Sequence, residues 1–136
     1  MSASRILFAA LAALLAWLAT HVLVEKALLV TAILICPEGL GSGGECHVSW
    51  WSNVSRTFVV FGVGLSAMAT IGAAAWVGKA DIYRVSRVTY VLGMVAASAL
   101  VITTGFSGLV LACWFSALCA GWLMVKWLDS QPHLFN

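Results

Sequence analysis

Apolar residues form four long runs along this chain, and short polar segments separate the runs. The first run covers residues 6–35, and the others cover residues 57–78, 88–104 and 107–128. A helix needs roughly 20 apolar residues to cross a hydrocarbon core of about 30 Å, a length that these runs can meet. The pattern therefore predicts an all-α integral membrane protein, with four transmembrane helices in one domain that covers residues 1–136.

The composition supports a membrane protein and argues against a soluble one. Hydrophobic residues make up 62% of the chain and charged residues 9%, whereas soluble domains carry about 25% charged residues. The polar segments are also too short to bury a hydrophobic core of their own. The net charge of +2 is dispersed without a basic stripe, so no nucleic-acid partner is indicated. The expected partners are membrane lipids and other transmembrane subunits.

The first apolar run is longer than one membrane span needs. As a single helix it would extend about 45 Å, beyond the hydrocarbon thickness of about 30 Å. It must therefore tilt, protrude from the membrane, or break near His21 to Lys26. Arg5 precedes the run as in a secretory signal, but the run is long and no small-x-small cleavage site ends it, so we expect a retained first helix.

Three ionisable residues, His21, Glu25 and Lys26, interrupt this run and form the candidate polar site of the chain. His21 and Glu25 are four residues apart and share a helix face, whereas Lys26 points about 100° away from Glu25. Ionisable residues inside a membrane commonly face an interior or a water-filled path, which would suit a proton relay or a ligand site. The alternative, favoured by the adjacent opposite charges, is that they end a span beside a snorkelling lysine or contact another subunit.

Cys36 and Cys46 bracket a glycine-rich segment that Pro37 separates from the first helix. Their separation across a flexible turn predicts a structural disulfide, which requires an oxidising compartment. With its four spans and external cysteines the chain also resembles quinone-linked thiol oxidases, which implies a redox-active pair, but their CxxC motif is absent here. Cys36, Cys46 and His47 lack a fourth ligand at a recognisable spacing, so we predict no metal site.

The distribution of basic residues predicts the orientation in the membrane. With the N-terminus in the cytoplasm, the outer side receives Lys26 and Arg56, and the inner side receives Arg5, Lys79, Arg84, Arg87 and Lys126. This excess follows the positive-inside rule. The same orientation places both termini in the cytoplasm and the cysteine segment outside, where a disulfide persists. We expect the protein in a bacterial inner (plasma) membrane, with residues 36–46 facing the periplasm or exterior.

Small residues recur at every fourth position in parts of the last three spans. They are Gly62, Ser66, Thr70 and Ala74 in the second span, Gly93 and Ala97 in the third, and Ala112, Ser116 and Ala120 in the fourth. Such spacing lets helix backbones approach closely where lipid offers no hydrophobic drive for association. We therefore predict helix packing at these positions, either within the chain or against a partner. The pattern implies no cofactor, although bound lipid is expected.

The sequence contains no enzyme motif, since a glycine-rich phosphate loop, a Ser/His/Asp arrangement and paired carboxylates are all missing. The last three spans contain no histidine that could ligate a haem. Cys113 and Cys119 lie six residues apart, point to different faces of a helix, and are expected to be buried thiols. These observations favour a non-catalytic accessory subunit of a larger membrane complex.

Two alternatives belong to other functional classes. In its size, its four spans and the lone acidic residue of its first helix, Glu25, the chain resembles small multidrug resistance transporters, which implies oligomeric, proton-coupled transport through Glu25. The glycine-rich cysteine segment departs from that pattern, and Lys26 beside Glu25 favours the charged carboxylate. The second alternative is a membrane thiol oxidoreductase that uses Cys36 and Cys46, which the missing CxxC motif disfavours.

Overall fold

The computed structural model describes residues 3–35, 49–78 and 81–131. They form four α-helices, namely α1 (Ala3–Ile35), α2 (Trp51–Val77), α3 (Ile82–Thr104) and α4 (Gly108–Ser130). Each helix is long and apolar enough to cross a membrane. The prediction of an all-α protein with four candidate membrane helices is therefore confirmed. Cys36 and Cys46 lie outside the described residues, so their disulfide stays a prediction.

Two helices begin earlier than the apolar runs from which they were predicted. α2 begins at Trp51 rather than near residue 57, and α3 begins at Ile82 rather than near residue 88. The additional residues are largely polar but include no proline, and hydropathy marks the apolar part of a helix rather than its ends.

α1 is a single unbroken helix of 33 residues. At 1.5 Å per residue it is about 50 Å long. A break near His21 to Lys26 does not occur, which leaves tilt or protrusion to accommodate the length. The hydroxyl groups of Thr20 and Thr31 donate to backbone carbonyls one turn earlier, at 2.8 and 2.7 Å. These bonds satisfy the polar groups of both threonines inside the helix.

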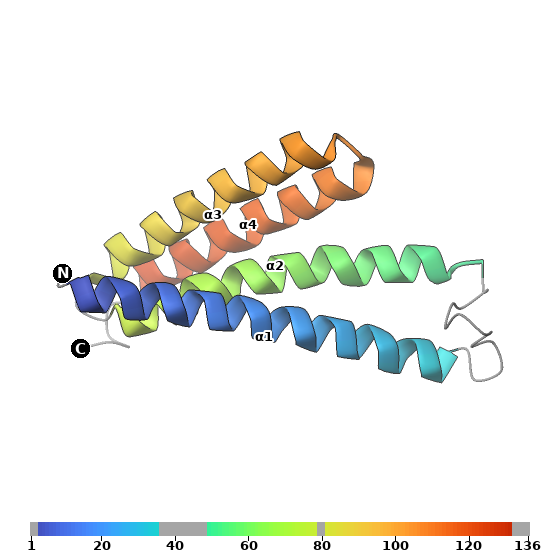
Figure 1. Ribbon diagram of the computed structural model, residues 1–136, viewed down its shortest axis with the longest axis horizontal. Coiled ribbons are helices and arrows are strands. Elements are labelled where there is room, and N and C mark those ends of the chain that lie inside the picture. The colour runs from blue at the N-terminus through green and yellow to red at the C-terminus, as the bar shows by residue number, and fades with distance from the viewer. Residues whose placement is uncertain (1–2, 36–48, 79–80, 132–136) are drawn as a thin grey trace.

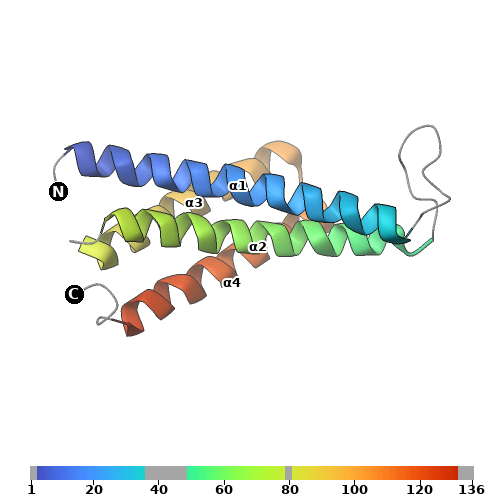
Figure 2. The same ribbon diagram turned by 90° about the horizontal axis from the view of Figure 1, so that it is seen from below.

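α2 is the central helix of the bundle. It packs against all three other helices, whereas α1 packs mainly against α2. α1 lies antiparallel beside α2, and the hairpin of α3 and α4 packs across α2 (Figures 1 and 2). The start of α1 and the end of α4 lie at one end of the bundle, which we call the terminal end. The turn between α3 and α4 lies toward the opposite end, which we call the hairpin end.

The most buried side chains lie at the terminal end. One cluster joins α2, α3 and α4 and consists of Ile71, Ala75, Ile82, Val125 and Leu128, with Tyr90 and Met124 packed against it. Ala9 of α1 forms a second cluster with Ala74 and Val85. Toward the hairpin end the hairpin of α3 and α4 diverges from α1 and α2 (Figure 1). The bundle is therefore closed at the terminal end and open at the hairpin end.

The turn between α3 and α4 covers residues 105–107. Gly105 has φ 88°, a conformation that glycine adopts without steric cost. Ser107 caps α4, because its hydroxyl oxygen accepts a hydrogen bond from the amide of Val110 at 3.3 Å. This local chemistry divides the last two apolar runs into two antiparallel helices.

The closest helix contacts involve glycines of α2. A Cβ on Gly62 would lie 2.7 Å from Cγ1 of Val24 in α1, and a Cβ on Gly64 would lie 2.6 Å from Oγ of Ser116 in α4. Both neighbours therefore approach α2 too closely for a larger residue to fit without a shift. The Ser116 hydroxyl also donates to the carbonyl of Val60 at 2.8 Å. The contact between α2 and α4 thus combines close approach with an interhelical hydrogen bond.

The predicted small-residue positions differ in burial. Gly62 and Ala74 are buried, and their neighbours include Val24 and Ala9 of α1. The half-buried positions are Ser66, Thr70, Ala97, Ser116 and Ala120. Gly93 and Ala112 are exposed. Gly62 and Ala74 of α2 therefore pack against α1. Gly93 and Ala112 lie on the surface of the bundle instead.

Gly121 and Gly93 provide a matched test of glycine packing. A Cβ on Gly121 would lie 2.9 Å from ring atoms of Tyr90, whose hydroxyl donates to the carbonyl of Leu118 at 3.2 Å. We expect Gly121→Val to lower the free energy of unfolding by about 1–3 kcal/mol, because the ring must move. Gly93→Val adds the same side chain where a Cβ has no neighbour within 4 Å, and should cost less. Unfolding in detergent micelles, followed by circular dichroism, compares the two, and equal losses would contradict the packing described.

Candidate functional site

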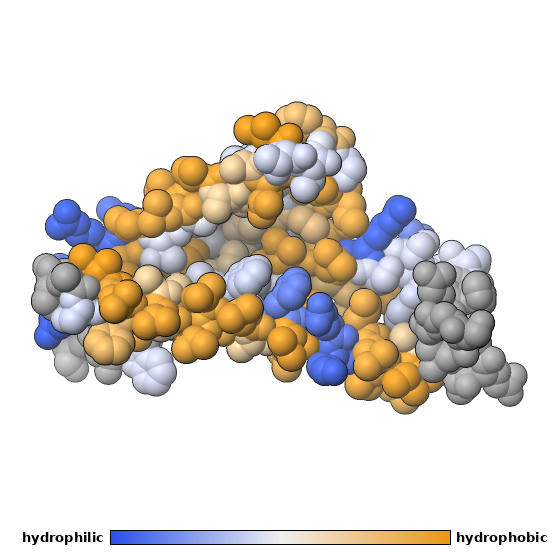
Figure 3. Space-filling view, in the orientation of Figure 1, coloured by the Kyte–Doolittle hydropathy of each residue, from blue (hydrophilic) through white to orange (hydrophobic). Residues whose placement is uncertain are grey.

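The candidate polar site lies on the outer surface of α1. The side chains of His21 and Glu25 are 64% and 68% exposed, and Lys26 is also exposed. The neighbouring residue Val24 points the other way, against Gly62 of α2. A hydrophilic patch interrupts the hydrophobic surface of α1 in Figure 3. The structure thus brings the three predicted residues together, on a surface rather than in an interior.

Contacts within the site are weak. Nε2 of His21 lies 3.8 Å from Oε1 of Glu25, which is too long for a hydrogen bond. One turn earlier, Trp17 stacks on His21, with 5.6 Å between the ring centroids. Lys26 forms no hydrogen bond or ion pair with the described residues. The carboxylate and ammonium groups therefore keep most of their hydrogen-bonding capacity for groups outside the chain.

The site is level with the middle of the bundle rather than with the end of a helix. Val24 contacts Gly62, which lies near the middle of α2, and Gly64 contacts Ser116 near the middle of α4. α1 continues without interruption beyond the site. The site is therefore flanked by apolar helix on both sides along α1.

The polar site does not line either of two grooves on the described surface. The first has a volume of about 700 Å³, lies between α2 and α4 at the hairpin end, and includes Arg56. The second has a volume of about 330 Å³, lies between α1 and α2, and has apolar walls that include Leu23 and Val24. Glu25 therefore does not face either of these spaces inside the chain.

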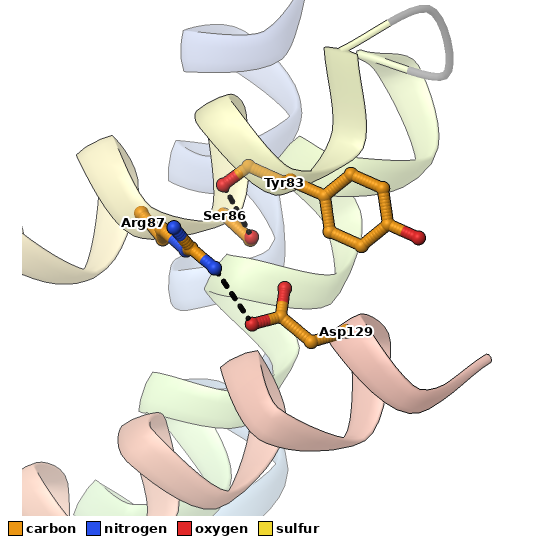
Figure 4. A network of polar contacts seen from close by, with 4 residues as sticks. All are labelled: Tyr83, Ser86, Arg87 and Asp129. Carbon is orange, nitrogen blue, oxygen red and sulfur yellow. Dashed lines mark hydrogen bonds and ion pairs between the residues drawn. The ribbon is translucent and has the colours of Figure 1, made fainter. Parts of the chain in front are cut away.

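A second group of polar side chains joins α3 to α4 at the terminal end (Figure 4). The guanidinium of Arg87 donates to Oδ2 of Asp129 at 3.0 Å. Ser86 is fully buried and donates its hydroxyl hydrogen to the carbonyl of Tyr83 at 3.2 Å. Oδ1 of Asp129 is buried and has no hydrogen-bond partner among the described residues. Because Arg87 is 65% exposed, its ion pair contributes at most about 1 kcal/mol to the free energy of unfolding. We interpret it as a structural contact between α3 and α4.

Neither metal ligands nor a thiol pair come together in residues 3–35, 49–78 and 81–131. No group of three or more His, Cys, Asp and Glu side chains in these ranges could hold a metal ion. Cys113 is half-buried and Cys119 is exposed, and both are free thiols. The expectation of two buried thiols is therefore wrong, because α4 turns Cys119 outward. Cys36, Cys46 and His47 lie outside the described residues, and their roles stay predictions.

One grouping of residues has no counterpart in the sequence pattern. In the sequence, Arg56 bears only on the orientation of the chain in the membrane. In the structure it lines the same groove as Ser107 and Gly108. These residues are far apart in the chain, and no spacing rule connects them. The only sequence signal was an arginine at the edge of an apolar span.

Comparisons of this chain with protein-family models, with curated proteins and with solved structures give no match. The chemistry of the chain's own residues therefore carries the functional argument. The two features available for it are the outward polar site on α1 and the groove beside Arg56.

Glu25 should contribute little to the fold of the isolated chain. Its side chain is exposed, and its Oε1 lies 3.8 Å from Nε2 of His21. We expect Glu25→Gln to change the free energy of unfolding by less than about 0.5 kcal/mol, as is usual for surface substitutions. Detergent unfolding of the purified chain measures this change, with Gly121→Val as the control that shows the assay is sensitive. A large loss would mean that Glu25 supports the fold rather than an external contact.

Proposed function

We propose that this protein is a non-catalytic subunit of a larger membrane complex, and that the outer face of α1 packs against transmembrane helices of its partners. One observation carries the proposal: Glu25 and Lys26 project from the outer surface of α1, level with the middle of α2. Ionisable residues within a membrane are costly and generally face a partner or a water-filled cavity. Of the four candidate spans, α1 has the smallest buried share, 6%, so it keeps the most surface for a partner.

Helix lengths support a position of Glu25 within the hydrocarbon. Arg56 and the hairpin turn line one groove and so lie at a similar level. From Arg56 to Trp76, α2 rises about 30 Å, which equals the hydrocarbon thickness. The residue before Glu25 contacts Gly62, about 9 Å further along α2 than Arg56. In this arrangement the Glu25 carboxylate lies inside the hydrocarbon.

The outer face of α1 has a composition that suits another helix. Leu18, Val22 and Leu29 are exposed and recur at helical spacing, so they form an apolar ridge. Glu25 and Lys26 flank this ridge. A partner helix can pack apolar side chains on the ridge and offer a hydrogen-bond donor to the Glu25 carboxylate. Interhelical hydrogen bonds in membranes contribute about 0.6–2 kcal/mol each.

The alternatives have less support. A proton-coupled carrier needs its carboxylate beside a water-filled path, whereas Glu25 is 68% exposed and lines neither groove. A thiol oxidoreductase would depend on Cys36 and Cys46, and no observation on the described residues favours it.

The same proposal includes an orientation in a bacterial inner membrane. Among the described basic residues, Arg5, Arg84, Arg87 and Lys126 lie toward the terminal end. Arg56 lies toward the hairpin end, and Lys26 lies level with the middle of α2. The positive-inside rule favours a cytoplasmic terminal end. Residues 36–46 would then face the periplasm or exterior, an environment that suits the predicted disulfide.

Replacement of Glu25 should weaken assembly without unfolding the chain. We expect Glu25→Gln to reduce the co-purification of other membrane subunits after gentle detergent extraction by about fivefold, since a charged hydrogen bond to the partner is lost. Native mass spectrometry of the extracted species gives the stoichiometry directly.

Asp81→Asn is the matched control for this experiment. It removes the same charge at the start of α3, where Asp81 forms no capping hydrogen bond through its side chain. This variant should assemble like the wild type. Wild-type protein that extracts only as a monomer or homodimer, or equal losses in the two variants, would contradict the proposal.

A further inference from the structure

The groove between α2 and α4 combines a cation with apolar walls. It has a volume of about 700 Å³ and lies where the hairpin of α3 and α4 diverges from α2. In Figure 3 the surface is hollowed between the hairpin and the paired helices α1 and α2. A volume of this size is within the range of pockets that hold small organic ligands.

Polarity changes along the groove in the direction of the helix axes. Arg56 on α2 and Ser107 at the start of α4 lie at its mouth. One to two turns further along each helix, the walls are formed by Val60 and Phe61 of α2 and by Ala112 of α4. A groove with a charged end and apolar walls suits an amphiphile whose head group is polar and whose tail is a hydrocarbon chain.

The polar groups at the mouth are hydrogen-bond donors. Arg56 is exposed and forms no hydrogen bond or ion pair with the described residues, so its guanidinium keeps its donors available. The Ser107 hydroxyl accepts from the amide of Val110 at 3.3 Å, which leaves its hydrogen free to donate. The Thr57 hydroxyl already donates to the carbonyl of Asn53 at 2.8 Å. A cation and a hydroxyl donor that line the same groove favour an anion with several oxygen acceptors, such as a phosphodiester.

We propose that this groove binds one anionic phospholipid. Its phosphate lies against Arg56 and Ser107, and an acyl chain follows the apolar wall past Val60 and Ala112. Ala112 is exposed at this wall, so the groove opens sideways to the bilayer, where a lipid rather than a soluble phosphate can enter. This site does not depend on the proposed role of α1 in assembly.

Lipid titration of the purified full-length chain tests the proposal. Native mass spectrometry records the lipids that remain bound when the protein in detergent is titrated with phosphatidylglycerol or with phosphatidylcholine. We expect one phosphatidylglycerol to bind more tightly than phosphatidylcholine, and inorganic phosphate not to compete. Arg56→Gln should weaken phosphatidylglycerol binding about fivefold, the usual effect of one basic residue near an anionic lipid.

Two further variants separate the head-group contact from the acyl-chain contact. Arg84→Gln removes the same charge from an exposed position near the start of α3 and should bind phosphatidylglycerol like the wild type. Ala112→Phe fills the apolar wall without changing charge and should weaken binding. Equal binding of the two lipids, equal losses in Arg56→Gln and Arg84→Gln, or unchanged binding in Ala112→Phe would each overturn the proposal.

Discussion

The close approach of α2 to its neighbours is the contact on which the rest of the arrangement depends. In lipid, helices gain no hydrophobic free energy from association, so close packing and interhelical hydrogen bonds must hold them together. Val24 lies against Gly62, and this contact fixes the rotation of α1 about its own axis. The next two residues then point about 100° and 200° away from Val24. Glu25 and Lys26 therefore project outward because Val24 projects inward.

That rotation connects the packing of the bundle to its proposed role. If α1 turned its charged residues toward α2, they would meet the largely apolar groove beside Leu23 and Val24. The structure instead leaves them on the surface, level with the middle of α2. A helix from another subunit can satisfy these groups there. In the assembly that we propose, a partner helix removes the cost of these exposed charges, which favours association.

The open hairpin end has a different physical origin. Buried residues of α2, α3 and α4 cluster at the terminal end, and the Arg87–Asp129 ion pair joins the start of α3 to the end of α4 there. Toward the hairpin turn, α3 and α4 together diverge from α1 and α2. Arg56 faces this opening without an ion-pair partner among the described residues. Divergence of the helices therefore creates the groove to which we assign a lipid.

The sequence predicted the four helices well because long apolar runs have few alternatives in a membrane. It also predicted helix packing at four small residues of α2, and of these Gly62 and Ala74 lie against α1. It did not single out Gly64 or Gly121, which lie outside the small-residue series that begin at Gly62 and Ala112, although both make close contacts. It could not choose between an interior and an outward Glu25. That choice depends on which face of α1 packs, and α1 is apolar nearly all round.

Photocrosslinking in native membranes tests whether the outer face of α1 contacts a helix of another protein within the membrane. A photoreactive amino acid replaces Val22, which is 53% exposed between Glu25 and Lys26 on the outer face. In a parallel sample it replaces Leu92, which is 64% exposed on α3. We predict a defined crosslink from position 22 to a transmembrane segment of a different protein, and mainly lipid adducts from position 92. Lipid adducts alone from both positions would contradict it.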